Sequence, residues 1–293
     1  MLEFKNITKT FGTFKALDDL SMTVPKGAVY GLVGPNGAGK STAIRHAVGV
    51  YRQDSGSVTF DGQTVYENSD VKTRIGSIPD DIFFFPSATL EDMHSYYRGL
   101  YPQFDDHLFS RLYEVFQLPK KSPIRRFSKG MQKQAAFHLS ICTRPDMLIL
   151  DEPVDGLDPV MRRQVWSLLL ADVAQRETTV LISSHNLREL EDICDHVGIM
   201  DHGKMLLEKS LADMQGTTHK LQMVGAAPES LEVLHESASG RLSTYIVRGS
   251  ASEISAVVAA ENPIYYDVLP LSLEEIFIYE LGGVNYEVKN IIL

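Results

Sequence analysis

A glycine-rich loop is the clearest chemical feature of the sequence. Residues 34–42 read Gly-Pro-Asn-Gly-Ala-Gly-Lys-Ser-Thr, which matches the phosphate-binding pattern G-x-x-x-x-G-K-[ST]. Glycines let successive backbone N–H groups surround a phosphate, and a helix that follows directs its positive end at the same anion. We expect Lys40 to contact the outer phosphates and Ser41 to bind Mg²⁺. The predicted phosphate-binding residues are Gly34, Pro35, Asn36, Gly37, Ala38, Gly39, Lys40, Ser41 and Thr42.

An acidic pair is the second chemical feature. Asp151-Glu152 follows Met147-Leu-Ile-Leu150, an apolar run that suits a strand covered on both faces. We expect Asp151 to contact Mg²⁺ and Glu152 to act as general base on the water that attacks the γ-phosphate, a role commonly worth about 10²- to 10⁴-fold. Taken alone, an acidic pair at a strand end is more often a helix cap or a turn, and only the glycine loop makes the chemical interpretation the better one.

The elements that must position these groups alternate between strands and helices. Apolar runs at residues 30–33, 147–150 and 179–182 each end in polar residues, which predicts an α/β fold with a mainly parallel sheet and a site at the strand ends. Between about residues 81 and 144 the strand signals vanish. An inserted helical subdomain is predicted there, with helices near 89–100, 105–117 and 128–143.

The pattern changes again after about Gly216. Residues 220–224 and 242–247 resemble strands, residues 253–260 resemble a helix, and Ser272-Leu-Glu-Glu275 offers a capping box for a last helix through Ile276, Phe277 and Leu281. We therefore predict two domains, a P-loop domain over residues 1–215 and a small C-terminal α/β domain over residues 216–293.

Composition excludes several classes of protein. The 293 residues carry a formal charge of −10, from 28 basic and 38 acidic side chains, which opposes broad attraction to nucleic acid or anionic lipid. Cys142 and Cys194 lie far apart in the sequence, so neither a disulfide framework nor a zinc site is expected, and a reducing compartment fits. The start resembles no signal peptide, and no stretch approaches the roughly 18 apolar residues of a membrane span. If the protein acts at a membrane, we therefore expect it to do so through a partner protein.

A five-residue string and the motifs that follow it resemble those of a known family. Phe127-Ser128-Lys129-Gly130-Met131, just before the acidic strand and at the start of a predicted helix, resembles the LSGGQ signature of the ABC ATPase family. Further marks follow in the family's order. Gly156-Leu-Asp158-Pro159 resembles the D-loop, His185 resembles the switch histidine, and Phe11 takes the place of the aromatic residue that stacks on adenine. The resemblance covers residues 1 to about 215.

The resemblance implies an ATPase that works as a dimer. Two copies, or one copy and a homologous subunit, would pair head to tail around two ATP molecules with Mg²⁺, so that each glycine loop faces the partner copy's Ser128 and Gly130. Lys40, Glu152 and His185 would be catalytic, and Asp158 would also lie near the nucleotide. The chain would drive transmembrane permease subunits from the cytoplasmic face of the membrane, as a peripheral protein. No nucleic acid is expected as partner.

Two residues depart from the family pattern. Asp80, after the predicted strand 75–78, stands where the family has the glutamine of its Q-loop, and it is expected to offer an oxygen toward Mg²⁺. Met131 replaces the usual glutamine of the signature. Both substitutions leave the groups needed for hydrolysis in place, but they put its rate and its coupling to transport in question.

Finer features indicate a subgroup and a docking site. The stretches Ile-Pro-Asp-Asp, Ser-Lys-Gly-Met and Leu-Ser-Leu-Glu-Glu-Ile-Phe resemble ABC-2-type exporter ATPases of the YtrB-like group. By this resemblance, Phe83-Phe84-Phe85 lies where the family docks a cytoplasmic helix of its membrane partner, and the alternative is that these aromatics fill the core of the helical insert. Two alternatives to a transport ATPase stay open, a soluble ABC-type ATPase that acts on ribosomes or DNA and a nucleotide-sensing scaffold.

Overall fold

The computed structural model describes residues 1–276. Its contacts divide the chain into two compact units. The first comprises Met1–His185 and His196–Glu208, and the second comprises Asn186–Asp195 and the residues from Lys209 onward. The domain boundary predicted near residue 215 stays a prediction.

The parallel sheet of the first unit has the strand order β10-β9-β3-β8-β7-β6. The strands β3, β6, β7, β8 and β9 are joined by parallel pairings, and β3, β7 and β8 are buried along their whole length, as expected for strands covered on both faces. Their bounds are Val29–Val33 (β3), Ile75–Ile78 (β6), Met147–Asp151 (β7), Thr179–Ser184 (β8), His196–Asp201 (β9) and Lys204–Ser210 (β10). The register aligns Asp151 with Ser183 and Val33 with Ser184, so the predicted chemical groups meet at one edge of the sheet.

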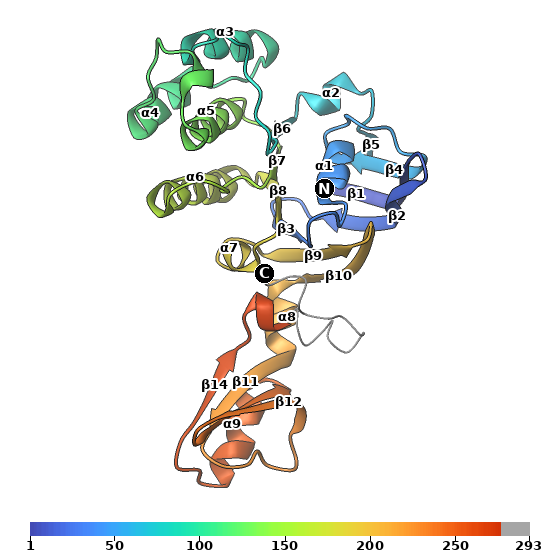
Figure 1. Cartoon of the computed structure of the whole chain (residues 1–293), viewed down its shortest axis with the longest axis vertical. Coiled ribbons are helices and arrows are strands. Elements are labelled where there is room, and N and C mark those ends of the chain that lie inside the picture. Colours follow the sequence, from blue (N-terminus) through green and yellow to red (C-terminus); the bar gives the residue numbers. More distant parts are fainter. Residues whose placement is uncertain (277–293) are drawn as a thin grey trace. The chain divides into compact units, whose positions relative to one another are not determined.

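A second, antiparallel sheet was not predicted. Its order is β2-β1-β4-β5, formed by Leu2–Phe11 (β1), Phe14–Val24 (β2), Ser55–Phe60 (β4) and Gln63–Thr64 (β5). The helix α1 (Lys40–Ala47) lies between the two sheets (Figure 1), and its apolar residues share one core cluster with residues of both. This packing fixes the helix that begins at the end of the glycine loop. The short helix α2 (Ser69–Lys72) precedes β6.

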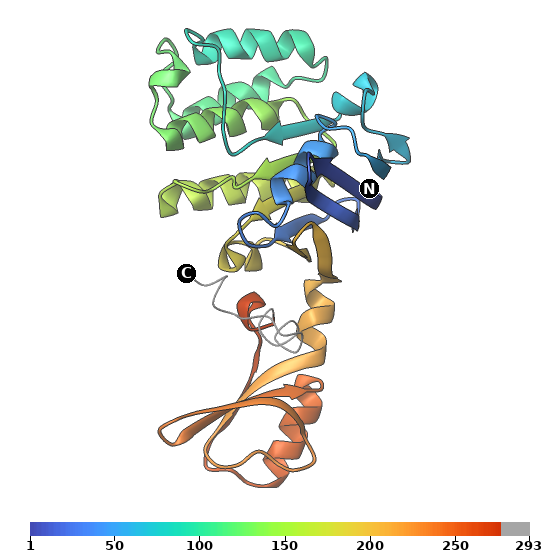
Figure 2. The same cartoon turned by 45° about the vertical axis from the view of Figure 1, so that its right-hand side comes forward.

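The helical insert is confirmed. It contains α3 (Leu90–Leu100), α4 (Asp106–Phe116), the 3₁₀ turn η1 (Ile124–Arg126) and α5 (Lys129–Cys142), and α3 and α4 both pack on α5 (Figure 2). The starts are locally encoded, since Thr89 and Asp92 form a capping box and Asp105 and Ser128 cap the next two helices through their side chains. The long helix α6 (Pro159–Arg176) follows β7 and leads to β8.

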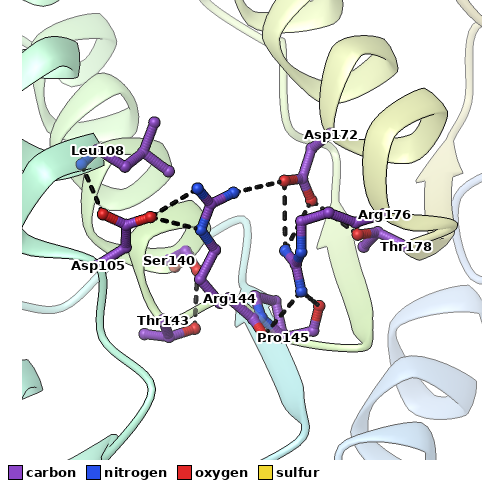
Figure 3. A network of polar contacts seen from close by, with 9 residues as sticks. All are labelled: Asp105, Leu108, Ser140, Thr143, Arg144, Pro145, Asp172, Arg176 and Thr178. Atoms are coloured by element: carbon purple, nitrogen blue, oxygen red, sulfur yellow. Dashed lines mark hydrogen bonds and ion pairs between the residues drawn. The ribbon is translucent and has the colours of Figure 1, made fainter.

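Arg144 fastens the insert to the parallel sheet's helix α6 (Figure 3). Its guanidinium donates to Asp105, the cap of α4, at 2.6 and 2.9 Å, and to Asp172 of α6 at 3.1 Å. Asp172 also accepts from Arg176 and Thr178, and Arg176 donates onward to the backbone carbonyls of residues 144 and 145. The network therefore ties an insert helix, the turn before β7 and α6 together.

We expect an Arg144→Met variant to lose about 1.5–3 kcal/mol of unfolding free energy, because it removes charge-assisted hydrogen bonds from two partly buried carboxylates. Urea unfolding of variant and wild type measures the change. Arg98→Met is the matched control, since Arg98 is exposed and, within residues 1–276, forms an ion pair only with surface Asp106 at 3.2 Å, so a loss under about 1 kcal/mol is expected. Equal losses in the two variants would show that the network contributes nothing particular.

The second unit contains an antiparallel sheet with the order β12-β13-β11-β14. The helix α9 (Ala251–Ala260) lies along one face of this sheet (Figure 2) and shares its apolar core. The strands are Thr218–Met223 (β11), Glu232–Ser239 (β12), Leu242–Arg248 (β13) and Tyr266–Pro270 (β14), and the short helices are Leu187–Glu191 (α7) and Leu211–Thr217 (α8). The predicted strands and helix are confirmed, whereas β12 and β14 were not predicted.

The predicted last helix begins as expected. Ser272 and Glu275 form the capping box, with the Glu275 amide donating to the Ser272 hydroxyl at 3.2 Å. The helix's expected continuation through Phe277 and Leu281 lies outside the described residues. Within residues 1–276, no helix is both long enough and apolar enough to cross a membrane.

Candidate active site

The glycine loop connects β3 to α1 and borders a cavity of about 290 Å³. The lining comprises Phe14, Ala16, residues 35–42, Asp80 and Glu152. All the predicted phosphate-binding residues except Gly34 are therefore brought together at one cavity, with Glu152 and Asp80 on its wall. The start of α1 faces the same space, so the helix dipole favours an anion there.

Lys40 is held by the loop that it follows. Its ammonium donates to the Gly34 carbonyl at 2.6 Å and to the Pro35 carbonyl at 3.3 Å. Burial lowers the pKa of Lys40 below its ordinary value, and the negative charges of Glu152 and Asp151 offset part of this by raising it. A buried ammonium with mainly carbonyl partners is stabilised further by an anion placed beside it, which fits a phosphate in this cavity.

The glycines of the loop meet different structural demands. A Cβ atom at Gly34 would lie 2.2 Å from the Met200 carbonyl oxygen at the end of β9, so no side chain fits there. Gly37 has open space around it but a φ of +86°, a backbone conformation that other residues rarely adopt. Gly39 combines a φ of +104° with a Cβ position 2.7 Å from the Ala16 carbonyl oxygen.

The acidic pair at the end of β7 is fixed by β8. Asp151 is buried and accepts a hydrogen bond from the Ser183 hydroxyl. The Glu152 backbone N–H donates to the Ser183 carbonyl at 3.1 Å, and the Glu152 carboxylate accepts from His185 Nδ1 at 3.0 Å. Three predicted residues, Asp151, Glu152 and His185, thus form one connected group.

Glu152 has properties that suit a general base. Burial raises the pKa of Glu152 above its ordinary value, while the hydrogen bond from His185 and the charge of Lys40 act in the opposite direction. A carboxylate with a raised pKa accepts a proton more readily from water. Its backbone φ of +45° lies in the left-handed region that favours glycine, and such strain in a non-glycine residue is often found at active sites.

Asp80 lies on the cavity wall with Glu152, and Lys133 is close to both residues. Lys133 of α5 donates to the Glu152 backbone carbonyl at 2.7 Å and lies 3.5 Å from the Asp80 carboxylate. Asp80 also lines a neighbouring cavity together with Lys133 and Asp155. Lys133 was not predicted from the sequence as a site residue. Its position just after the signature string could have pointed to the site, but a lysine in a helix is usually solvated and so gave no reason to expect burial.

The signature and D-loop residues have structural roles within the chain. Ser128 caps α5 by accepting from the Met131 amide at 3.2 Å, and Asp158 caps α6 by accepting from the amides of residues 160 and 161. Gly130 lies near Gly156 and Leu157. Among the described residues, none of Ser128, Gly130 and Asp158 lines the glycine-loop cavity of its own chain. Their predicted contacts with nucleotide require a second copy and stay predictions.

Two phenylalanines sit at the turn between β1 and β2. Phe11 and Phe14 are paired across the strands and both are exposed. Phe14 lines the cavity, whereas Phe11 makes an edge contact with Tyr51, with ring centroids 5.5 Å apart. Phe11 was predicted to stack on adenine and Phe14 was not, because the family pattern points only to the first position.

The aromatic stretch after β6 splits between core and surface. Phe84 is 4% exposed, whereas Phe83 is 74% and Phe85 is 48% exposed. Phe85 makes an edge contact with exposed Tyr96 of α3, with ring centroids 5.5 Å apart. Phe84 therefore belongs to the core, whereas docking through Phe83 and Phe85 stays a prediction.

The comparisons with known proteins agree with this geometry. A family model described as ABC transporter matches residues 17–155. The chain is 31% identical over 288 residues to the ABC transporter ATP-binding protein YtrB of Bacillus subtilis, covering 97% of this chain and 99% of that protein. It is 33% identical to the lantibiotic transport ATP-binding protein SrtF of Streptococcus pyogenes, covering 71% of this chain and 90% of that one.

Solved structures show the same architecture. The structure of an ATP-binding subunit of an ABC transporter aligns with a TM-score of 0.68 at 26% identity, covering 73% of this chain and 92% of that one. The dimeric cassette MJ0796 in a post-hydrolysis state with ADP and Pi aligns with a TM-score of 0.66 at 19% identity over 72% of this chain and 99% of that one, which supports the fold.

Proposed function

This chain belongs to the ABC transporter family of ATP-binding proteins, and from that premise we propose that two copies close around two ATP molecules and that Glu152 of each copy activates the attacking water. The chain is the ATP-binding and ATP-hydrolysing subunit of a transporter, of the YtrB-like exporter group. The observation that carries the proposed role of Glu152 is its position on the wall of the glycine-loop cavity, with His185 donating to its carboxylate.

The described residues suit Mg²⁺. Ser41, Asp80 and Asp151 offer only oxygen ligands, which this ion prefers, and no group of three or more acidic, histidine or cysteine side chains in residues 1–276 forms a cage that could hold a metal alone. Mg²⁺ typically takes one or two protein oxygens together with substrate phosphates. We propose Ser41 and Asp151 as its main protein partners. When bound, the ion would neutralise negative charge on the phosphates.

The protein groups have separate tasks in hydrolysis. The loop amides and Lys40 bind and orient the phosphates, and buried Asp151 is held in place by Ser183. Glu152 accepts the proton of the water, while His185 holds the Glu152 carboxylate through its Nδ1 atom. His185 also offers a second ring nitrogen that can contact the γ-phosphate. In the closed dimer, Ser128 and Gly130 of the partner copy would add donors to the same nucleotide, so ATP favours the closed state by binding it better.

Phe83 and Phe85 are proposed as the anchor for a cytoplasmic helix of the permease, at the cytoplasmic face of the membrane. Both side chains are exposed and lie close to Asp80 in the sequence, and Phe85 makes an edge contact with exposed Tyr96. Large aromatic side chains are enriched at the centres of protein interfaces. Phe84 is excluded as an anchor, because it is buried in the insert.

We expect a Phe83→Asp, Phe85→Asp double variant to lose at least about tenfold in association with membrane vesicles from cells that contain the transporter, because it places two charges in an apolar contact. The fraction bound after sedimentation measures the effect. ATP turnover of the purified variant should stay within about twofold of wild type. Tyr265→Asp is the matched control, with an exposed aromatic in the second unit, and undiminished binding by the double variant would refute the docking site.

A further inference from the structure

Lys133 is a buried cation next to the catalytic group. Its residue exposure is 7%, and it lies one turn into α5, beyond the cap residue Ser128. The ammonium donates to the Glu152 carbonyl at 2.7 Å and lies 3.5 Å from the Asp80 carboxylate. A long flexible side chain loses considerable conformational freedom when it is held this way, so the contacts that order it are substantial.

The backbone at Glu152 needs support from both sides. Its φ of +45° is strained for a residue with a side chain, and such a conformation persists only where the surroundings fix it. The N–H of Glu152 is fixed by the Ser183 carbonyl at 3.1 Å and its hydroxyl at 3.3 Å, both from β8. The carbonyl of Glu152 is fixed by the Lys133 ammonium from α5. The catalytic turn is thus held between the parallel sheet and the helical insert.

We propose that Lys133 is a positioning residue that orients the Glu152 carboxylate by holding its backbone carbonyl, an inference that rests on the proposed role of Glu152 as general base. Asp80, which lines the glycine-loop cavity, balances the charge of the buried ammonium. An uncharged side chain at residue 80 would leave the ammonium without this partner. Asp80, which stands where the family has a glutamine, is therefore paired with Lys133, whose charge it balances.

Lys133 lies on the helix that carries the signature residues. This helix is capped by Ser128, contains Gly130 and continues through Lys133.

The test compares steady-state kinetics of variants at residue 133. Lys133→Met keeps the length of the side chain but removes the donor, and we expect kcat to fall about 10- to 100-fold, as a misplacement of about 1 Å can cost 10²-fold. KM for ATP should change less than about threefold, because the phosphate site is intact. Lys133→Arg should recover most of kcat. Lys26→Met, an exposed lysine paired with Glu177 at 3.6 Å, is the control expected to match wild type.

A second background separates the two contacts of Lys133. In an Asp80→Asn chain, Lys133→Met should still lower kcat by the same factor if the ammonium acts through the Glu152 carbonyl; no additional loss would overturn the proposal. Equal losses in kcat and in ATP affinity would overturn it too, since they indicate general disruption. If Lys133→Met does not fold, Lys133→Gln, which keeps a neutral donor, replaces it and should retain part of kcat. Wild-type kcat in Lys133→Met, or in Lys133→Gln where it replaces that variant, would overturn the proposal.

The role of Glu152 is checked in parallel. If Glu152→Gln is inactive while Lys133→Met turns over like wild type, the positioning role alone is wrong. If Glu152→Gln itself retains normal turnover, the proposed function of the site is wrong. Circular dichroism and ATP binding of each variant confirm that the fold is retained.

Discussion

A Glu152→Gln variant is expected to bind ATP with near-normal affinity and to lose about 10²- to 10⁴-fold in turnover, because the amide keeps the size of the side chain but cannot accept the proton of the attacking water. The carboxylate lies on the cavity wall and is oriented by His185 at 3.0 Å. Since the bound nucleotide would persist, dimers should accumulate with ATP. Phosphate release and size-exclusion chromatography with ATP measure the two effects.

The control for this variant is Glu177→Gln. Glu177 is exposed at the C-terminus of α6 and its charge pairs only weakly with Lys26, at 3.6 Å. Its turnover should equal that of wild type. Unchanged turnover in Glu152→Gln would refute the assignment of the base, and loss of ATP binding in that variant would show that Glu152 serves the nucleotide site in another way.

A Lys40→Met variant is expected to lose nucleotide affinity itself. A charge-assisted hydrogen bond to phosphate is worth about 1.5–3 kcal/mol, which corresponds to roughly 10- to 150-fold in Kd. The loss should exceed this, because the same ammonium closes the loop on the carbonyls of Gly34 and Pro35 at 2.6 and 3.3 Å. Calorimetric titration with ATP measures the affinity directly.

Lys204→Met controls for the loss of one positive charge, since Lys204 is exposed and pairs with Asp18 at 3.1 Å. Its ATP affinity should be unchanged. Lys40→Arg should also bind poorly, because the larger planar guanidinium does not fit the buried position of a compact ammonium. ATP affinity retained in Lys40→Met would contradict the phosphate site.

The sequence predicted those parts of the molecule whose signals are local. The glycine loop, the acidic strand end and the Ser128 cap of α5 each depend on a few adjacent residues, and the structure contains them where expected. The polar ends of β7 and β8 were expected to meet because parallel strands share an edge, and Asp151 lies directly opposite Ser183. Local chemistry and strand direction were sufficient for the catalytic group.

The features that were missed depend on contacts between distant segments. The pairing of β1 with β2 has register shifts, which blur the alternation that marks a strand. Strand β12 is mostly exposed, so it carries little apolar signal. Lys133 and Phe84 face inward only because of what packs against them, and neither residue type nor spacing distinguishes Phe84 from its exposed neighbours.

The unlike demands on Gly34 and Gly37 affect how a saturation mutagenesis screen of this loop is interpreted. Substitution at either position is disfavoured, yet at Gly34 the obstacle is the backbone oxygen of Met200, while at Gly37 it is a left-handed φ that asparagine tolerates better than other side chains. A single intolerance score per position merges steric exclusion, torsional preference and ligand contact. Intolerance to substitution at Gly34 would therefore reflect the close packing of the loop against Met200 of β9, and it would not report how tightly the loop binds phosphate.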